Sequence, residues 1–257
     1  MNIVVCLKQT FDTEAKIVID GSGNIDSTGV DQIINPYDEF AIEEALQLKE
    51  KFGGEVTVVS MGPEKAEAAI RTALAMGCDK GVLITDPGLE NPDEWVTAEV
   101  LSKAIAQIPY DIILVGRIAV DFGASQVGVR LADLLDIPSV SSILKLEIDG
   151  DKATVTREID GGTELIELSL PAVLTAQKGL NTPRYPSMMG IMKAKKKEVK
   201  VLNLADLGLN ASDLQPKMTV QKFSLPTPRT AGKKIEGEPA EVAAELAKLL
   251  REEAKVI

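Results

Sequence analysis

The stretch that decides the fold is Ile112-Ile113-Leu114-Val115-Gly116-Arg117-Ile118-Ala119-Val120-Asp121-Phe122-Gly123-Ala124-Ser125-Gln126-Val127-Gly128. It begins with a short apolar run, passes through a loop that contains two glycines, and leads into a segment with helical spacing. Short, uninterrupted apolar runs are typical of parallel strands that are buried on both faces. The stretch therefore predicts a strand, a loop and a helix of an α/β sheet.

The same pattern recurs upstream. Apolar runs at Ile3–Leu7, Val56–Ser60 and Gly81–Ile84 predict three further strands. Between and after the strands, helices are predicted over 36–52, 64–76, 93–107 and 124–135, and Asn35 is expected to cap the first of them. Strands that alternate with helices predict right-handed βαβ units. The expected fold class is α/β, with a doubly wound, mostly parallel sheet.

The pattern changes after Pro138. Ile143–Ile148, Ala153–Glu158 and Thr163–Leu168 alternate apolar with polar residues, and Asp-Gly turns separate them. This alternation predicts an antiparallel meander. Upstream, residues 16–34 interrupt the first crossover and are expected to form a hairpin or an irregular insertion. Downstream, 188–197 is expected to be a short helix or loop with a basic end.

The C-terminal residues have a different character. Residues 212–238 lack periodicity and are rich in proline and lysine, which predicts an extended arm. Residues 239–255 then place Val242, Leu246, Leu249 and Leu250 on one face of a helix. We expect this helix to pack on a partner chain, and the alternative is that it folds back. The expected division is a nucleotide-binding domain, 1–211, and an arm with its helix, 212–257.

The composition excludes several classes of function. The 257 residues carry a net charge of −11, which disfavours binding to nucleic acid or to an anionic membrane surface. The chain has no histidine, which excludes Ser-His-Asp and Cys-His catalysis within it. Cys6 and Cys78 are expected to be buried thiols in a reducing compartment. No apolar run is long enough for a membrane helix, so cytoplasmic localisation without membrane insertion is expected.

A candidate ligand site follows from the predicted topology. The chain has neither the GxGxxG nor the GxxxxGK[ST] phosphate motif. In the common doubly wound strand order, however, the first and fourth strands are neighbours, and ligands bind at their carboxyl ends. A nucleotide phosphate would be held by N–H groups at the following helix start. The alternative is a turn that only joins a strand to a helix. The candidate cofactor-binding residues are Cys6, Asn35, Pro36, Tyr37, Asp38, Met61, Gly116, Arg117, Ile118, Ala119, Val120, Asp121, Phe122, Gly123, Ala124, Ser125, Gln126 and Val127.

A second candidate site is a lysine block that follows a methionine-rich run. A lysine run is most often a solvated face, but flexible methionines suit adaptable binding surfaces. We expect a protein-docking site here, with Met188, Met189, Ile191, Lys193, Lys195 and Lys196 as its residues.

Several of these stretches resemble the β subunit of electron transfer flavoproteins. The resemblance is densest from Val155 to Gly162, Leu170 to Thr175, Leu180 to Tyr185 and Ile191 to Lys197. It extends to the N-terminal strand and to the 116–128 loop, so it spans nearly the whole chain.

The resemblance implies an αβ heterodimer that carries electrons from a flavin dehydrogenase, such as an acyl-CoA dehydrogenase, to a quinone oxidoreductase or another acceptor. It implies an FAD held mainly by the α subunit, and a nucleotide in the crevice described above. That nucleotide is expected to be AMP, with a second FAD, as in bifurcating members, as the alternative. It also implies that the lysine block is a recognition loop with Met188 at its apolar anchor, and that Glu158 steadies the mobile flavin domain.

We expect no metal site and no catalysis of bond chemistry by this chain itself, because it has no convincing acid–base or nucleophile set and the flavin carries the redox chemistry. An alternative from another class is a stand-alone adenosine-nucleotide-binding regulatory protein. That alternative would explain residues 1–140 but not the meander, the lysine block or the arm.

Overall fold

The computed structural model describes residues 1–89, 91–229 and 231–257, so Thr230 of the predicted arm lies outside the described residues. The chain divides into two units, which are described separately. The larger unit comprises Met1–Ile17 and Asp26–Gln221, and the smaller comprises Val18–Ile25 and Lys222–Ile257. The predicted division into a nucleotide-binding domain and a partner-binding arm concerns what the parts bind, and it stays a prediction.

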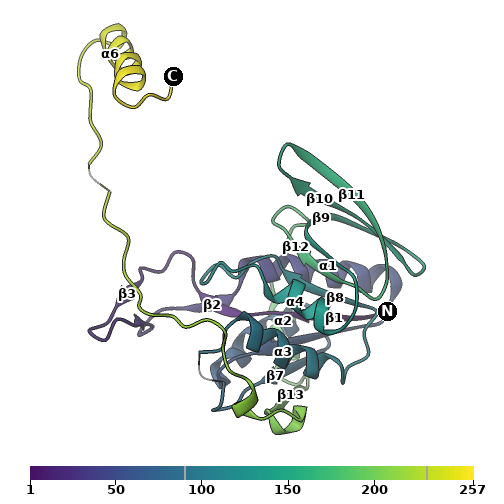
Figure 1. Ribbon diagram of the computed structural model, residues 1–257. Coiled ribbons are helices and arrows are strands. Elements are labelled where there is room, and N and C mark those ends of the chain that lie inside the picture. The colour runs from purple at the N-terminus through teal and green to yellow at the C-terminus, as the bar shows by residue number, and fades with distance from the viewer. Residues whose placement is uncertain (90, 230) are drawn as a thin grey trace. The chain divides into compact units, whose positions relative to one another are not determined.

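The larger unit is built on a nine-stranded sheet within the described residues (Figure 1). The strand order is β11-β10-β9-β12-β8-β1-β6-β7-β13. The parallel part, β7-β6-β1-β8-β12, winds outward in both directions from β1. The predicted doubly wound sheet is confirmed. The strands are β1 (Asn2–Cys6), β6 (Glu55–Met61), β7 (Lys80–Ile84), β8 (Ile112–Gly116), β9 (Ser139–Asp149), β10 (Lys152–Ile159), β11 (Gly162–Ser169), β12 (Val173–Ala176) and β13 (Val199–Leu202).

Helices cover both faces of this sheet. Ile3 and Val5 of β1 belong to the apolar cluster of α1 (Pro36–Phe52) and α2 (Glu67–Met76). Val4 and Cys6 belong to the opposite cluster, with α3 (Glu94–Ile105) and α4 (Val127–Leu134). Alternate residues of a strand point to opposite faces, so a strand buried on both sides needs an unbroken apolar run. This requirement explains the uninterrupted sequence of β1.

The predicted meander is confirmed, and it extends the same sheet. Strands β9, β10 and β11 pair antiparallel with one another, and β9 pairs parallel with β12. On the opposite edge, β13 pairs parallel with β7. The insertion in the first crossover consists of β2 (Gln9–Phe11) paired with β5 (Gln32–Ile34), and β3 (Val18–Ile19) paired with β4 (Ile25–Asp26).

Two predicted helices begin three residues later than expected. A 3-10 turn, Glu64–Ala66, precedes α2. Helix α4 begins at Val127 rather than Ala124, because Ser125 has a positive φ of 55° that an α-helix cannot contain. At 188–197, where a short helix or a loop is expected, the chain forms a short helix, α5 (Met188–Ala194). Short 3-10 turns follow at Ala205–Leu207 and Ala211–Asp213.

The smaller unit contains α6 (Pro239–Glu252), within the predicted 239–255. None of the residues of α6 is buried among the described residues. The described residues between Leu214 and Glu238 form neither helix nor strand, as the arm prediction requires. Within this unit, the Phe223 N–H donates to the Gly23 carbonyl at 3.3 Å.

Candidate functional site

The carboxyl ends of β1 and β8 lie side by side, as the strand order predicts. Cys6 is in register with Val115, and both strands end at the same edge of the sheet. The segments that follow this edge are the loop of residues 116–127, here called the β8–α4 loop, and the start of α1. These are the places where the sequence predicts a ligand crevice.

Asp38 joins three segments at this edge. Its carboxylate accepts hydrogen bonds from the Lys8 N–H at 2.7 Å, the Asn35 side-chain amide at 2.9 Å and the Gly116 N–H at 3.1 Å. Burial raises the pKa of Asp38 to about 7, although the three donors and the Lys8 charge lower it. The carboxylate therefore fixes β1, α1 and the loop to one another.

Asn35 holds the next part of the loop. Its amide nitrogen donates to the Ile118 carbonyl at 2.8 Å, and its side-chain oxygen accepts from the Val120 N–H at 3.2 Å. Asn35 stands at the N-cap position of α1, but its side chain does not cap the helix. The prediction that the Asn35 side chain caps α1 is wrong, because this side chain instead forms its hydrogen bonds with Asp38 and with the backbone of the β8–α4 loop. Asn35 and Asp38 are both buried, so they support the loop from beneath.

Gly116 permits this close approach of loop and helix. A Cβ atom at this position would overlap the Asp38 carboxylate and the backbone of Tyr37. A side chain at 116 would therefore break the Gly116 N–H bond to Asp38 or displace the start of α1. The glycine is therefore required by packing.

The tip of the loop faces solvent and carries free donors. Lys8 and Asp121 form an ion pair at 2.8 Å, and Phe122 is half exposed. Within the described residues, the backbone N–H groups of Ala124, Ser125 and Gln126 make no hydrogen bond. These donors lie immediately before α4, although the helix starts later than predicted.

The remaining predicted crevice residues differ in role. Cys6 is a buried free thiol, and burial together with Asp38 raises its pKa to about 12. Met61 packs partly against the core cluster of α3 and α4. Of the other predicted residues, Pro36, Tyr37, Arg117, Ala119 and Val127 are partly exposed, and Gly123 is exposed.

Two surface grooves lie away from the β8–α4 loop. One, of about 450 Å³, lies over the meander and the end of α1. The other, of about 590 Å³, is here called the α2–α5 groove, and it is lined by Ala68, Arg71, Thr72, Ala75, Pro186, Ile191, Ala194 and Lys195. Neither groove includes a predicted crevice residue, whereas the second includes two predicted docking residues, Ile191 and Lys195.

The predicted docking residues from Met188 to Lys196 lie on α5 and immediately after it. Met188 and Met192 are 80% and 70% exposed, and Met189 and Ile191 are exposed beside them. Lys193, Lys195 and Lys196 are also exposed. The Ser187 side chain accepts from the Gly190 N–H at 3.0 Å and so caps the helix. Residues 186–197, here called the docking segment, therefore present large apolar side chains to solvent, followed by cations.

The docking segment is fixed to α2. Arg71 donates to the carbonyls of Ala194 at 2.9 Å and Lys197 at 2.7 Å. Lys197 in turn donates to the Leu74 and Cys78 carbonyls. A Cβ atom at Gly190 would overlap the Ala75 carbonyl, so the two helices pack backbone to backbone there. Lys197, which the sequence grouped with the basic docking block, is thus committed to internal contacts.

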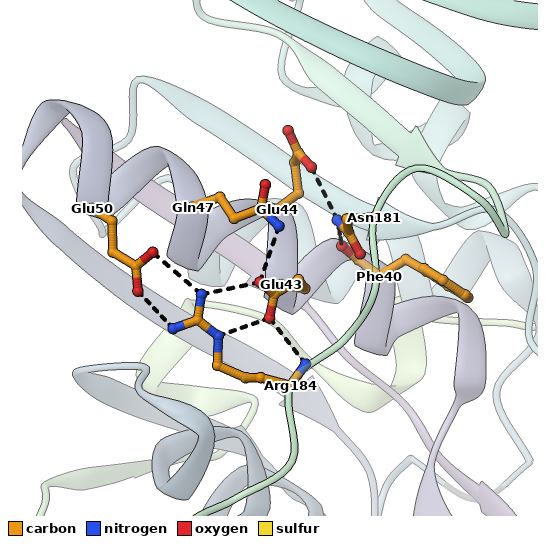
Figure 2. A network of polar contacts seen from close by, with 7 residues as sticks. All are labelled: Phe40, Glu43, Glu44, Gln47, Glu50, Asn181 and Arg184. Atoms are coloured by element: carbon orange, nitrogen blue, oxygen red, sulfur yellow. Dashed lines mark hydrogen bonds and ion pairs between the residues drawn. The ribbon is translucent and has the colours of Figure 1, made fainter.

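The chain before the docking segment is fixed to α1 (Figure 2). The Arg184 guanidinium binds Glu43 at 2.8 Å and Glu50 at 2.6 Å, and Asn181 donates to Glu44 at 2.9 Å. Burial raises the pKa of Glu43, but the bonds from Arg184 and Gln47 lower it below its ordinary value. The sequence did not identify this network. Arg184 and Asn181 appeared only as part of the resemblance, and Glu43 lies 141 residues before Arg184.

Glu158 lies on β10, and in the sequence it belongs neither to the β8–α4 loop nor to the docking segment. It is exposed and stands in register with Thr163 of β11. Its predicted role toward a flavin domain stays a prediction.

Comparison with known proteins identifies the family. A model of the electron transfer flavoprotein domain matches residues 22–207. The electron transfer flavoprotein subunit beta of Bacillus subtilis is 53% identical over the whole of both chains. The chain belongs to the electron transfer flavoprotein β-subunit family. The subunit beta of Syntrophomonas wolfei is 48% identical over 100% of this chain and 98% of its own, and that of Homo sapiens is 41% identical over 92% and 93%.

The family assignment covers the meander, the docking segment and the arm as well as the parallel sheet. It confirms the resemblance read from the sequence. Among the described residues, no helix has the length and apolar character needed to cross a membrane.

Proposed function

We propose that this chain is the β subunit of a heterodimeric electron transfer flavoprotein. In this role it carries electrons, together with an α subunit, from a flavin dehydrogenase such as an acyl-CoA dehydrogenase to a quinone oxidoreductase or a similar acceptor. The observation that supports this most strongly is the 53% identity over the full length of a subunit beta. Full-length similarity favours this role over a stand-alone nucleotide-binding regulator, which would not need the meander, docking segment or arm.

The proposed ligand of this chain is AMP at the β8–α4 loop, with a second FAD as the alternative. The residues fit a phosphate. The unbonded N–H groups of Ala124, Ser125 and Gln126 are donors at the start of α4. Asn35 and Asp38 would hold the loop in shape beneath the ligand. AMP would contribute binding energy and order without redox chemistry, whereas a second flavin would add a redox centre.

The redox FAD is proposed to be held mainly by the α subunit, so this chain needs no catalytic group of its own. Its tasks are to bind the α subunit through the arm and α6, to hold the nucleotide, and to dock the donor through Met188, Met189, Ile191, Lys193, Lys195 and Lys196. The lysines would steer an acidic partner, and the apolar side chains would determine its residence time.

The experiment is to co-express the chain with an α subunit, purify the complex, denature it and count the released nucleotides. We expect a yellow heterodimer that releases one FAD and one AMP. Release of two FAD and no AMP would support the bifurcating alternative. A colourless homodimer that binds no α subunit would contradict the proposed function.

A further inference from the structure

The α2–α5 groove lies directly beside the exposed methionines and is mostly apolar. Ala68, Ala75 and Ala194 line it with methyl groups, and Pro186 and Ile191 add larger apolar surface. Its volume of about 590 Å³ exceeds that of any single side chain. On such a surface, the methionines can enter a hollow of the partner, and a side chain of the partner can enter the groove.

The groove is formed before any partner arrives. Arg71 ties the C-terminal end of α5 to α2, and the contact of Gly190 with the Ala75 carbonyl sets the helix separation. On the other side, Arg184 ties the incoming chain to α1 through Glu43 and Glu50 (Figure 2). A site that needs no ordering on binding loses less affinity to conformational entropy.

The charge beside the groove is positive in a chain that is otherwise strongly negative. Lys193, Lys195 and Lys196 are exposed, and residues 186–197 contain no Asp or Glu, whereas the whole chain carries −11. Arg71 lines the groove, but its charge is balanced by Glu67 at 2.8 Å. The three lysines therefore determine which partner charge is attracted.

We propose that the α2–α5 groove binds an apolar side chain of the electron donor, presented from a segment whose neighbouring side chains are Asp or Glu. The proposal rests on the proposed docking function and adds a second contact to it. The methionines of α5 enter the donor, and one donor side chain enters the groove. Two interlocking apolar contacts fix orientation better than one, while the lysines pair with the acidic neighbours.

The test fills the groove in the heterodimer. Ala68 is exposed on α2 and lines the groove, so Ala68→Trp occupies it without disturbing the core. With a substrate-reduced acyl-CoA dehydrogenase as donor, we expect KM for the heterodimer to rise at least fivefold, with kcat and bound nucleotide unchanged. The matched control is Ala106→Trp at the exposed end of α3, where KM is expected to stay within twofold.

A second groove variant, Thr72→Trp, lies one helical turn from Ala68 and covers the case in which Ala68→Trp does not fold. If a folded groove variant leaves KM within twofold, the proposal is wrong. Met188→Ala tests the proposed docking function independently of the groove. A raised KM in Met188→Ala with unchanged groove variants overturns only the groove. Unchanged KM in all three variants overturns both.

Discussion

Two carboxylate networks on the same helix hold two different surface segments. At the start of α1, the buried Asp38 accepts three N–H donors and fixes the β8–α4 loop. One to three turns later, Glu43 and Glu50 pair with Arg184 and fix the chain that leads into the docking segment. Helix α1 is thus the common support of the proposed nucleotide site and the proposed docking site.

The two networks differ in how they compensate a buried charge. Asp38 relies on neutral backbone and amide donors with a lysine nearby, and its pKa is raised to about 7. Glu43 has a bidentate guanidinium, and its pKa is lowered. The contact of Asp38 with the β8–α4 loop is therefore sensitive to protonation near neutral pH, whereas the contact of Glu43 with Arg184 is not.

The largest expected effect is that of Asp38→Ala. The change leaves the Lys8 and Gly116 N–H groups and the Asn35 amide without their acceptor in a buried place, at a cost of about 3 kcal/mol. The Tm of the purified heterodimer should fall by on the order of 10 °C. Asp121→Ala, which removes only the partly exposed pair with Lys8, serves as the control and should lower Tm by about 3 °C or less. Equal shifts in the two variants would contradict the assigned role of Asp38.

The next effect is a pH dependence. The folded-state pKa of Asp38, about 7, lies above its ordinary value of 3.8, so the folded chain binds the proton more strongly. Its contribution to stability is present below about pH 4 and is lost as pH rises to about 7, by up to roughly 1.4 kcal/mol per pH unit. The Tm of the unchanged heterodimer minus that of Asp38→Asn should therefore fall across this window. A constant difference would show that Asp38 titrates at its ordinary value.

Arg184→Gln should lower stability less than Asp38→Ala does, and it should weaken donor docking more. It leaves the Glu43 side chain, which is only 5% exposed, without its cation, at a cost of about 2 kcal/mol, and Tm should fall by about 5 °C. KM for donor reduction should rise while the nucleotide content stays at its normal value. Arg184→Lys keeps the positive charge but loses the planar guanidinium, so we expect its Tm and KM to lie between those of the unchanged heterodimer and of Arg184→Gln. A matched control is Lys152→Gln, which removes the exposed pair with Glu167 on β10 and β11.

The smallest effect is expected from Glu50→Gln. Its pair with Arg184 is exposed on the Glu50 side, where ion pairs contribute less than about 1 kcal/mol. The Tm of the heterodimer should fall by about 2 °C or less, and the difference should vanish in concentrated NaCl. A shift as large as that of Arg184→Gln would mean that Glu50, and not Glu43, anchors Arg184.

Local patterns predicted the framework of the fold. The apolar runs of β1, β6, β7 and β8 and the spacing of α1 are short-range signals, and the strand order follows from general rules of winding. The alternation in β9, β10 and β11 likewise predicted the meander. Its attachment to β12 within one sheet depends on contacts across the sheet edge that no local pattern encodes.

The internal supports of the sites could not be predicted, because they pair residues far apart in sequence. The contact of Asn35 with Ile118 spans 83 positions, and that of Glu43 with Arg184 spans 141. In the sequence, Lys197 cannot be distinguished from the exposed lysines before it, whereas in the structure it donates to the Leu74 and Cys78 carbonyls. The late start of α4 depends on the backbone conformation of Ser125, a residue that rarely adopts a positive φ.

The proposed packing of α6 on an α subunit has a consequence for how the cell balances the two subunits. A copy of this chain made without its companion would display the leucines of a helix that buries none of its residues. Quality-control proteases and chaperones act on such unsatisfied apolar segments. We therefore expect surplus copies to be short-lived, so that the supply of one polypeptide limits the abundance of the other without any dedicated regulator.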